Sequence, residues 1–130
     1  MSQKNVDFLK AAIEAWNAGD MDAVRDSYHP DAMIARLEGW PEPGPIVGRE
    51  AVMRQWEQVR ETFDADSVET LSFIDAADRV VVRQIWHGTG SGPELKLEWT
   101  LVYTLRQGKI FLVEYFWDHA DALDALGLPG

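Results

Sequence analysis

The first half of the chain carries apolar residues at the spacing of amphipathic helices. This pattern predicts a helix over Ser2–Ala18, a short helix with Asp20 as its N-cap, and a third helix that begins after Gly48. A short strand is predicted between the second and third helices, over Ala32–Leu37. Because residues 38–45 include three prolines, they are expected to form an extended loop.

The second half changes to the alternating pattern and the β-branched and aromatic content of strands. Four strands are predicted, over Val68–Asp75, Arg79–Gly88, Leu95–Arg106 and Lys109–Trp117. Short connections join them, so we expect an antiparallel meander of neighbouring strands. A last short helix should begin at His119, with Asp118 as its N-cap and Gly127 at its C-terminal end.

This order of elements predicts an α+β fold. Three helices would cover the concave face of a long, curved antiparallel sheet, and a short C-terminal helix would follow. Curvature leaves a cone between the sheet and the helices, which is where a pocket for a small molecule can form. The length of 130 residues suits a single domain over 1–130.

Composition excludes several classes of function. The formal net charge is −10, whereas a nucleic-acid-binding surface needs clustered lysine and arginine. The chain has no cysteine, which removes disulfides, thiolate metal sites and cysteine nucleophiles. The three histidines lack metal-ligand spacing, so neither a metal nor another cofactor is expected.

Nothing in the pattern predicts a membrane protein. The longest apolar runs are only a few residues long, which is too short to span a bilayer. The N-terminal residues lack the basic segment and apolar stretch of a signal peptide. We therefore expect a cytoplasmic protein without membrane or nucleic-acid partners.

Several short motifs, taken in order, resemble a known family. The segments 16–22, 28–32 and 48–51 are similar to consecutive signatures of the NTF2-like superfamily, and 39–45 and 118–128 resemble its SnoaL-like, polyketide cyclase-like branch. The resemblance covers nearly the whole chain. It implies a cone-shaped, cystatin-like roll that forms a homodimer. This fold hosts isomerases, cyclases, epoxide hydrolases and non-enzymatic binding modules, so it does not define a reaction.

Two known chemistries of the superfamily do not match this chain. The positions that carry the catalytic groups of ketosteroid isomerases correspond here to Ala12, Arg36 and Leu101, which cannot replace a tyrosine and two aspartates. The Arg-x-Asp pattern of limonene-epoxide-hydrolase-like enzymes corresponds to the segment 83–85, which lacks the aspartate. Whether the protein is an enzyme therefore stays open.

Alternation along the strands, anchored on these motifs, assigns side chains to the two faces of the sheet. The predicted pocket-lining residues are Trp16, Ile34, Arg36, Trp56, Arg83, Ile85, His87, Trp99, Leu101, Tyr103, Tyr115 and Trp117. The predicted outer face contains Val80, Val82, Gln84, Trp86, Val102, Thr104, Leu112 and Phe116. Since a monomer seldom exposes so much apolar surface, a second copy is expected to cover this outer face.

The polar residues of the predicted pocket are the candidates for chemistry. Arg36 and Arg83 would bind an anionic group of a ligand, pair with internal carboxylates, or extend to the mouth of the pocket. The candidate carboxylates are Glu98, Glu114 and Asp118. His87 would act as an acid–base group or as a hydrogen-bonded wall residue. Tyr103, like Tyr115, would either donate to an oxyanion or fill core volume.

Three functions are compatible with this pattern. The first is a cyclase, isomerase or hydrolase that acts on a small, largely apolar, oxygenated substrate. The second is a non-catalytic binding protein with the same pocket. The third is a dimerisation module whose cone is filled by its own aromatic side chains.

Overall fold

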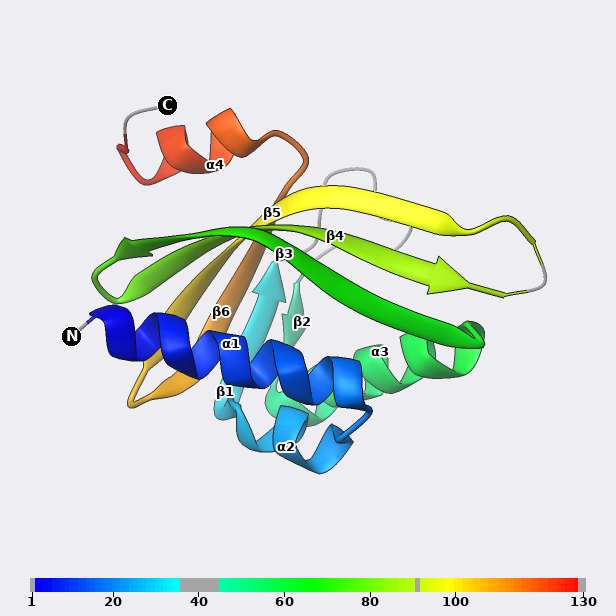
Figure 1. The fold of residues 1–130 in the computed structure, drawn as a ribbon. Coiled ribbons are helices and arrows are strands. Elements are labelled where there is room, and N and C mark those ends of the chain that lie inside the picture. Colours follow the sequence, from blue (N-terminus) through cyan, green and yellow to red (C-terminus); the bar gives the residue numbers. More distant parts are fainter. Residues whose placement is uncertain (1, 36–44, 91, 129–130) are drawn as a thin grey trace.

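The computed structural model describes residues 2–35, 45–90 and 92–128. Within them, six strands form one curved, open sheet in the order β2-β1-β6-β5-β4-β3, accompanied by four helices (Figure 1). The elements in chain order are α1 (Ser2–Ala18), α2 (Met21–Asp26), β1 (Tyr28–Ala35), β2 (Ile46–Val47), α3 (Arg49–Thr62), β3 (Ala65–Ala76), β4 (Arg79–Thr89), β5 (Leu95–Arg106), β6 (Lys109–Phe116) and α4 (His119–Ala125).

The antiparallel meander expected from the second half is confirmed. Strands β3, β4, β5 and β6 pair consecutively and antiparallel. The first strand is different, because β1 pairs with β6 in parallel, so that the sheet is mixed. No hairpin joins β1 to β6, and the long intervening chain leaves either orientation open. Strand β1 begins at Tyr28, earlier than the predicted start at Ala32, and the two-residue β2 is too short to leave a periodic signal.

The capping residues predicted for the helices are confirmed. Asp20 precedes α2 and accepts a hydrogen bond from the backbone N–H of Ala23 at 3.1 Å. Asp118 precedes α4 and accepts one from the N–H of Ala120 at 2.8 Å. Gly19 follows α1 with a φ of 76°, a left-handed conformation that glycine adopts without steric cost.

Side chains near both ends of α1 attach this helix to β3 and to the turn that follows it. The Asn17 side chain donates to the carbonyl of Val68 at 2.9 Å and accepts from its N–H at 2.7 Å. Asn5 donates to the carbonyl of Ala77 at 3.1 Å, at the β3–β4 turn. Because an amide side chain can satisfy both polar groups of an edge-strand residue, Asn17 continues the ladder onto the helix.

The helices lie on both faces of the sheet (Figure 1). Helices α1, α2 and α3 lie on the concave face, and the main core cluster fills the space between them and the strands. Helix α4 lies on the opposite face, where Ala122 and Leu123 pack on Val81 and Val102. Within the described residues, no helix combines the length and apolar character needed to cross a bilayer.

The face assignment of β4 predicted from the sequence is wrong. Gln84 pairs with Trp99 in the β4–β5 register, and paired residues share a face of the sheet. The even-numbered residues of β4 therefore face α1 and α3, and the odd-numbered residues, including Arg83, face outward. A shift of the pairing register by one residue moves every side chain of a strand to the other face of the sheet.

Candidate functional site

A cavity of about 290 Å³ lies between the concave face of the sheet and helices α1, α2 and α3. Its walls are mainly aliphatic and aromatic. The lining residues are Leu9, Ala12, Ile13, Trp16, Val24, Ser27, Tyr28, Trp56, Val59, Phe63, Val68, Gln84, Trp86, Leu95, Leu97, Trp99, Leu101, Tyr103, Ile110 and Tyr115. None of these lining residues is charged at neutral pH, so the cavity offers an apolar environment with a few hydrogen-bonding groups.

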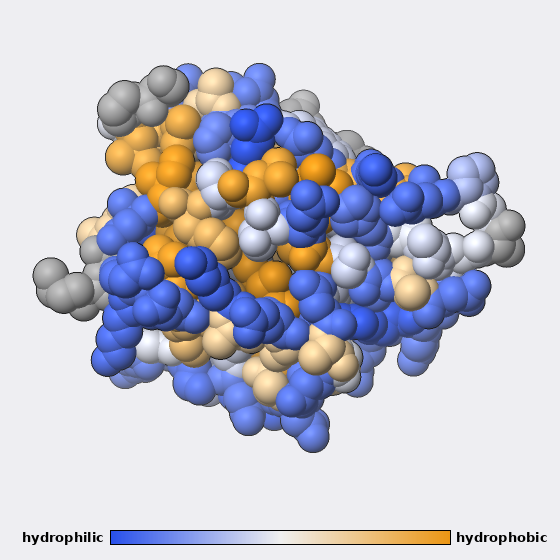
Figure 2. Space-filling model, viewed as in Figure 1, coloured by the Kyte–Doolittle hydropathy of each residue, from blue (hydrophilic) through white to orange (hydrophobic). Residues whose placement is uncertain are grey.

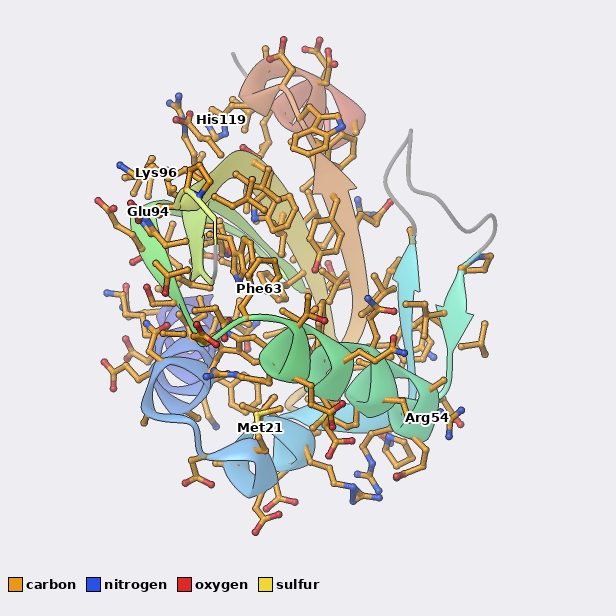
Figure 3. The ribbon with its side chains drawn as sticks, turned by 90° about the vertical axis from the view of Figure 1, so that its right-hand side faces the viewer. Met21, Arg54, Phe63, Glu94, Lys96 and His119 are labelled. Carbon is orange, nitrogen blue, oxygen red and sulfur yellow. The ribbon has the colours of Figure 1, made fainter. Side chains whose placement is uncertain are left out.

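Aromatic side chains define the shape of the cavity. The Trp99 and Tyr115 rings meet edge to face with centroids 5.0 Å apart, and those of Phe63 and Trp86 do so at 4.9 Å. A Cβ at Gly88 would approach Trp86 to 2.4 Å, so the absence of a side chain there allows the Phe63–Trp86 contact. Figure 3 shows Phe63 between α3 and the sheet.

All three tyrosines of the chain line this cavity. Burial raises the pKa of Tyr103 to about 12, and the neighbouring Gln84 side chain partly offsets this rise. Burial also raises the pKa of Tyr28 and of Tyr115, and in both cases the nearby Tyr103 adds to the rise. The three hydroxyls thus lie close enough to influence one another, and at neutral pH they act as protonated hydrogen-bonding groups.

Two hydrogen bonds and two unsatisfied donors complete the polar part of the cavity. The indole N–H of Trp56 donates to the Tyr28 hydroxyl at 3.1 Å, and that of Trp99 donates to Oε1 of Gln84 at 3.4 Å. The buried Nε2 of Gln84 and Nε1 of Trp16 have no hydrogen-bond partner among the described residues. Most buried donors in proteins are paired, so these two groups call for an explanation.

A charged pair supports the wall without lining the cavity. Nε of Arg60 lies 3.5 Å from Oδ1 of Asp66, whose side chain is only 2% exposed. The other carboxylate oxygen accepts from the indole N–H of Trp86 at 3.1 Å. The Arg60 guanidinium stacks on the Trp16 ring at 3.9 Å and donates to the Trp16 carbonyl. Arg60 therefore joins the ends of α1 and α3 to the sheet.

The polar candidates on β4 do not reach the cavity. Arg83 donates to Glu98 at 2.8 Å on the outer face, with 43% of its side chain exposed. This corrects its assignment as a pocket residue and matches the alternative of pairing with a carboxylate. His87 lies between Glu69 and Glu94, with 3.1 Å to each, and Ile85 is likewise absent from the lining. Glu94 lies on the outer side of the sheet in Figure 3.

The remaining predicted residues divide into four groups. Ile34 is buried in the main core cluster but is not among the lining residues. Trp117 is 52% exposed, with its ring centroid 5.9 Å from that of Trp99, and does not line the cavity. Arg36, with most of the proline-containing loop, lies outside the described residues. The predicted residues that do line the cavity are Trp16, Trp56, Trp99, Leu101, Tyr103 and Tyr115.

Sequence reasoning missed Gln84 and Trp86, which it placed on the outer face. A signal was present, because the even-numbered residues of β4 are more apolar as a set than Arg83, Ile85 and His87. The more apolar face of a strand generally packs on the core, so comparing the two sets would have favoured the observed orientation.

Solved structures with the same architecture include proteins of different kinds. An NTF2-like protein of unknown function from Burkholderia pseudomallei is 20% identical, with a TM-score of 0.77 over 95% of this chain and 97% of its own. A limonene-epoxide-hydrolase-like epoxide hydrolase from Mycobacterium tuberculosis is 14% identical (TM-score 0.76, covering 96% and 90%). Rv0760c from the same organism, in complex with estradiol-17β-hemisuccinate, is 15% identical (TM-score 0.75, covering 88% and 94%).

The fold is therefore NTF2-like, as the sequence motifs indicated. The profile of the SnoaL-like domain family matches residues 9–113, and the chain belongs to that family. No curated protein is significantly similar to it in sequence.

Proposed function

We propose that this protein binds a small, largely apolar, oxygenated molecule inside the cone. The observation that supports this most directly is the cavity of about 290 Å³, with aromatic walls and a group of tyrosine hydroxyls, in an otherwise well-packed core. A ligand complex of the structural neighbour Rv0760c, with estradiol-17β-hemisuccinate, is in keeping with the proposal.

Binding without chemistry agrees best with the groups that line the cavity. The described lining residues include neither a carboxylate nor a histidine. Their tyrosines are protonated at neutral pH, since the ordinary tyrosine pKa is 10.0 and burial raises it further. A second candidate function is a cofactor-independent cyclase, isomerase or hydrolase. Three tyrosine hydroxyls close together favour it, because they could stabilise a developing oxyanion. Chemical change of a bound molecule, seen by mass spectrometry, would distinguish this function from binding alone.

The binding proposal is tested by calorimetric titration with 2-acetylnaphthalene, a neutral bicyclic ketone. The wild type is expected to bind it at one site. The variant Leu97→Trp should lose this binding, because Leu97 lines the cavity and the larger side chain would fill the space.

The matched control is Lys96→Trp, one residue away on the same strand. Lys96 is exposed and lies on the outer side of the sheet (Figure 3), so this variant should bind like the wild type. Equal binding by both variants, or none by the wild type, would show that the cavity is not the binding site.

We also propose a homodimer that forms through the outer face of the sheet. Helix α4 covers part of this face, and Figure 2 shows apolar side chains gathered between α4 and α1. Leu71 on the edge strand β3 is 45% exposed.

Light scattering should give the mass of two chains for the wild type and of one chain for Leu71→Asp. The control Val47→Asp, at the other edge of the sheet, should stay dimeric, and a monomeric wild type would refute the proposal.

The cytoplasmic location of the protein remains a prediction.

A further inference from the structure

The side-chain amide of Gln84 is held in one orientation on the wall of the cavity. Gln84 is 3% exposed and lines the cavity from β4. Nε1 of Trp99 donates to its Oε1 at 3.4 Å. An indole N–H can only donate, so this contact requires the amide oxygen to face Trp99. The NH₂ group must then point away from Trp99.

This NH₂ group has donors without an acceptor. The Gln84 amide interacts with the Tyr103 hydroxyl and lowers its pKa, yet Nε2 has no partner in full hydrogen-bond geometry among the described residues. A buried donor without a partner destabilises the folded protein, and a ligand oxygen in the cavity would remove this cost. Nε1 of Trp16, on the helical wall of the same cavity, is a second buried donor of this kind.

The charges around the cavity disfavour an anionic ligand. Arg83 is paired with Glu98 on the outer face, and Arg60 is paired with Asp66 outside the lining. None of the described lining residues is charged at neutral pH. A carboxylate placed inside would therefore be buried without a counter-ion, which is strongly unfavourable. An uncharged oxygen avoids this penalty and still accepts a hydrogen bond.

We infer that the ligand of this cavity is an uncharged, mainly hydrocarbon molecule with a carbonyl oxygen that accepts a hydrogen bond from Nε2 of Gln84. The inference rests on the proposed binding function and specifies its ligand class. A carbonyl suits the site better than a group that must donate, because Nε2 has no acceptor capacity. A carbonyl oxygen also has a second lone pair, which can accept from the nearby Tyr103 hydroxyl.

The experiment compares three ligands of similar shape by calorimetric titration of the wild type. They are 2-acetylnaphthalene, 2-isopropylnaphthalene, which lacks the oxygen, and 2-naphthoate, which is an anion. We expect the ketone to bind about 3- to 10-fold more tightly than the hydrocarbon, as one net hydrogen bond provides. The anion should bind at least about 100-fold more weakly than the ketone at neutral pH. Its affinity should rise as the pH falls toward its own pKa.

The variant Gln84→Leu removes the donor and keeps the volume. It should lose most of the preference for the ketone over the hydrocarbon, while Lys96→Trp should keep the preference of the wild type. Circular dichroism establishes that each variant is folded, and the comparison of ligands on the wild type stands even if Gln84→Leu does not fold.

The outcomes separate the two proposals. Equal binding of ketone and hydrocarbon by the wild type would overturn the role of Gln84, and binding of 2-naphthoate as tight as that of the ketone would overturn the uncharged ligand class. Either result would leave the binding function intact. Failure of all three ligands to bind would overturn both proposals.

Discussion

Replacing Arg60 with methionine is expected to lower the free energy of unfolding by about 3–5 kcal/mol. The substitution keeps an aliphatic side chain over Trp16 but leaves the buried carboxylate of Asp66 without its positive partner. Removal of one member of a buried ion pair leaves an uncompensated charge, which is why the effect is large. Urea denaturation at an unchanged m-value measures it.

Two further variants isolate this cause. In the double variant Arg60→Met with Asp66→Asn, a neutral amide oxygen can still accept from Trp86, and most of the lost stability should return. Arg25→Met removes an exposed pair with Glu50 and should cost less than about 1 kcal/mol. If Arg60→Met is no more destabilising than Arg25→Met, the buried pair does not have the structural role assigned to it.

The three tyrosines are expected to titrate only as the protein unfolds. Each has a pKa in the folded protein above its ordinary value of 10.0, and for Tyr103 it is about 12. Above pH 10 the unfolded chain binds fewer protons than the folded one, so stability falls as the pH rises. The stabilising contribution of Tyr103 is complete below pH 10 and is lost between 10 and about 12, at roughly 1.4 kcal/mol per pH unit.

Ultraviolet absorbance of tyrosinate and circular dichroism, followed together during an alkaline titration, measure this behaviour. The two signals should change together and well above pH 10, because all the tyrosines of the chain are in the cavity. Tyr103→Phe should make the loss of stability with pH less steep, since one titrating group is removed. Tyrosinate that forms gradually near pH 10 in a protein that stays folded would contradict the prediction.

Local patterns were sufficient to predict most of the elements of this fold. Helix and strand periodicity, together with capping residues such as Asp20 and Asp118, depend on neighbours close in the chain. The faces of β5 could also be predicted, and Trp99, Leu101 and Tyr103 line the cavity as expected. The orientation of β1 could not, because its partner β6 is distant in the chain.

The sequence by itself therefore determined the order of the elements, the aromatic character of the pocket and the family. Only the tertiary structure decided which residues of β4 enter the cavity. Val80, Val81 and Val82 are all fully buried, because α1 and α3 lie on one side of the sheet and α4 lies on the other. Where both faces of the strand are covered, the sequence shows no alternation, and the more apolar even-numbered residues nearer Gly88 favour one orientation without fixing the register. Pairing with β5 settles the register, and it places an amide in the cavity and the guanidinium of Arg83 outside it.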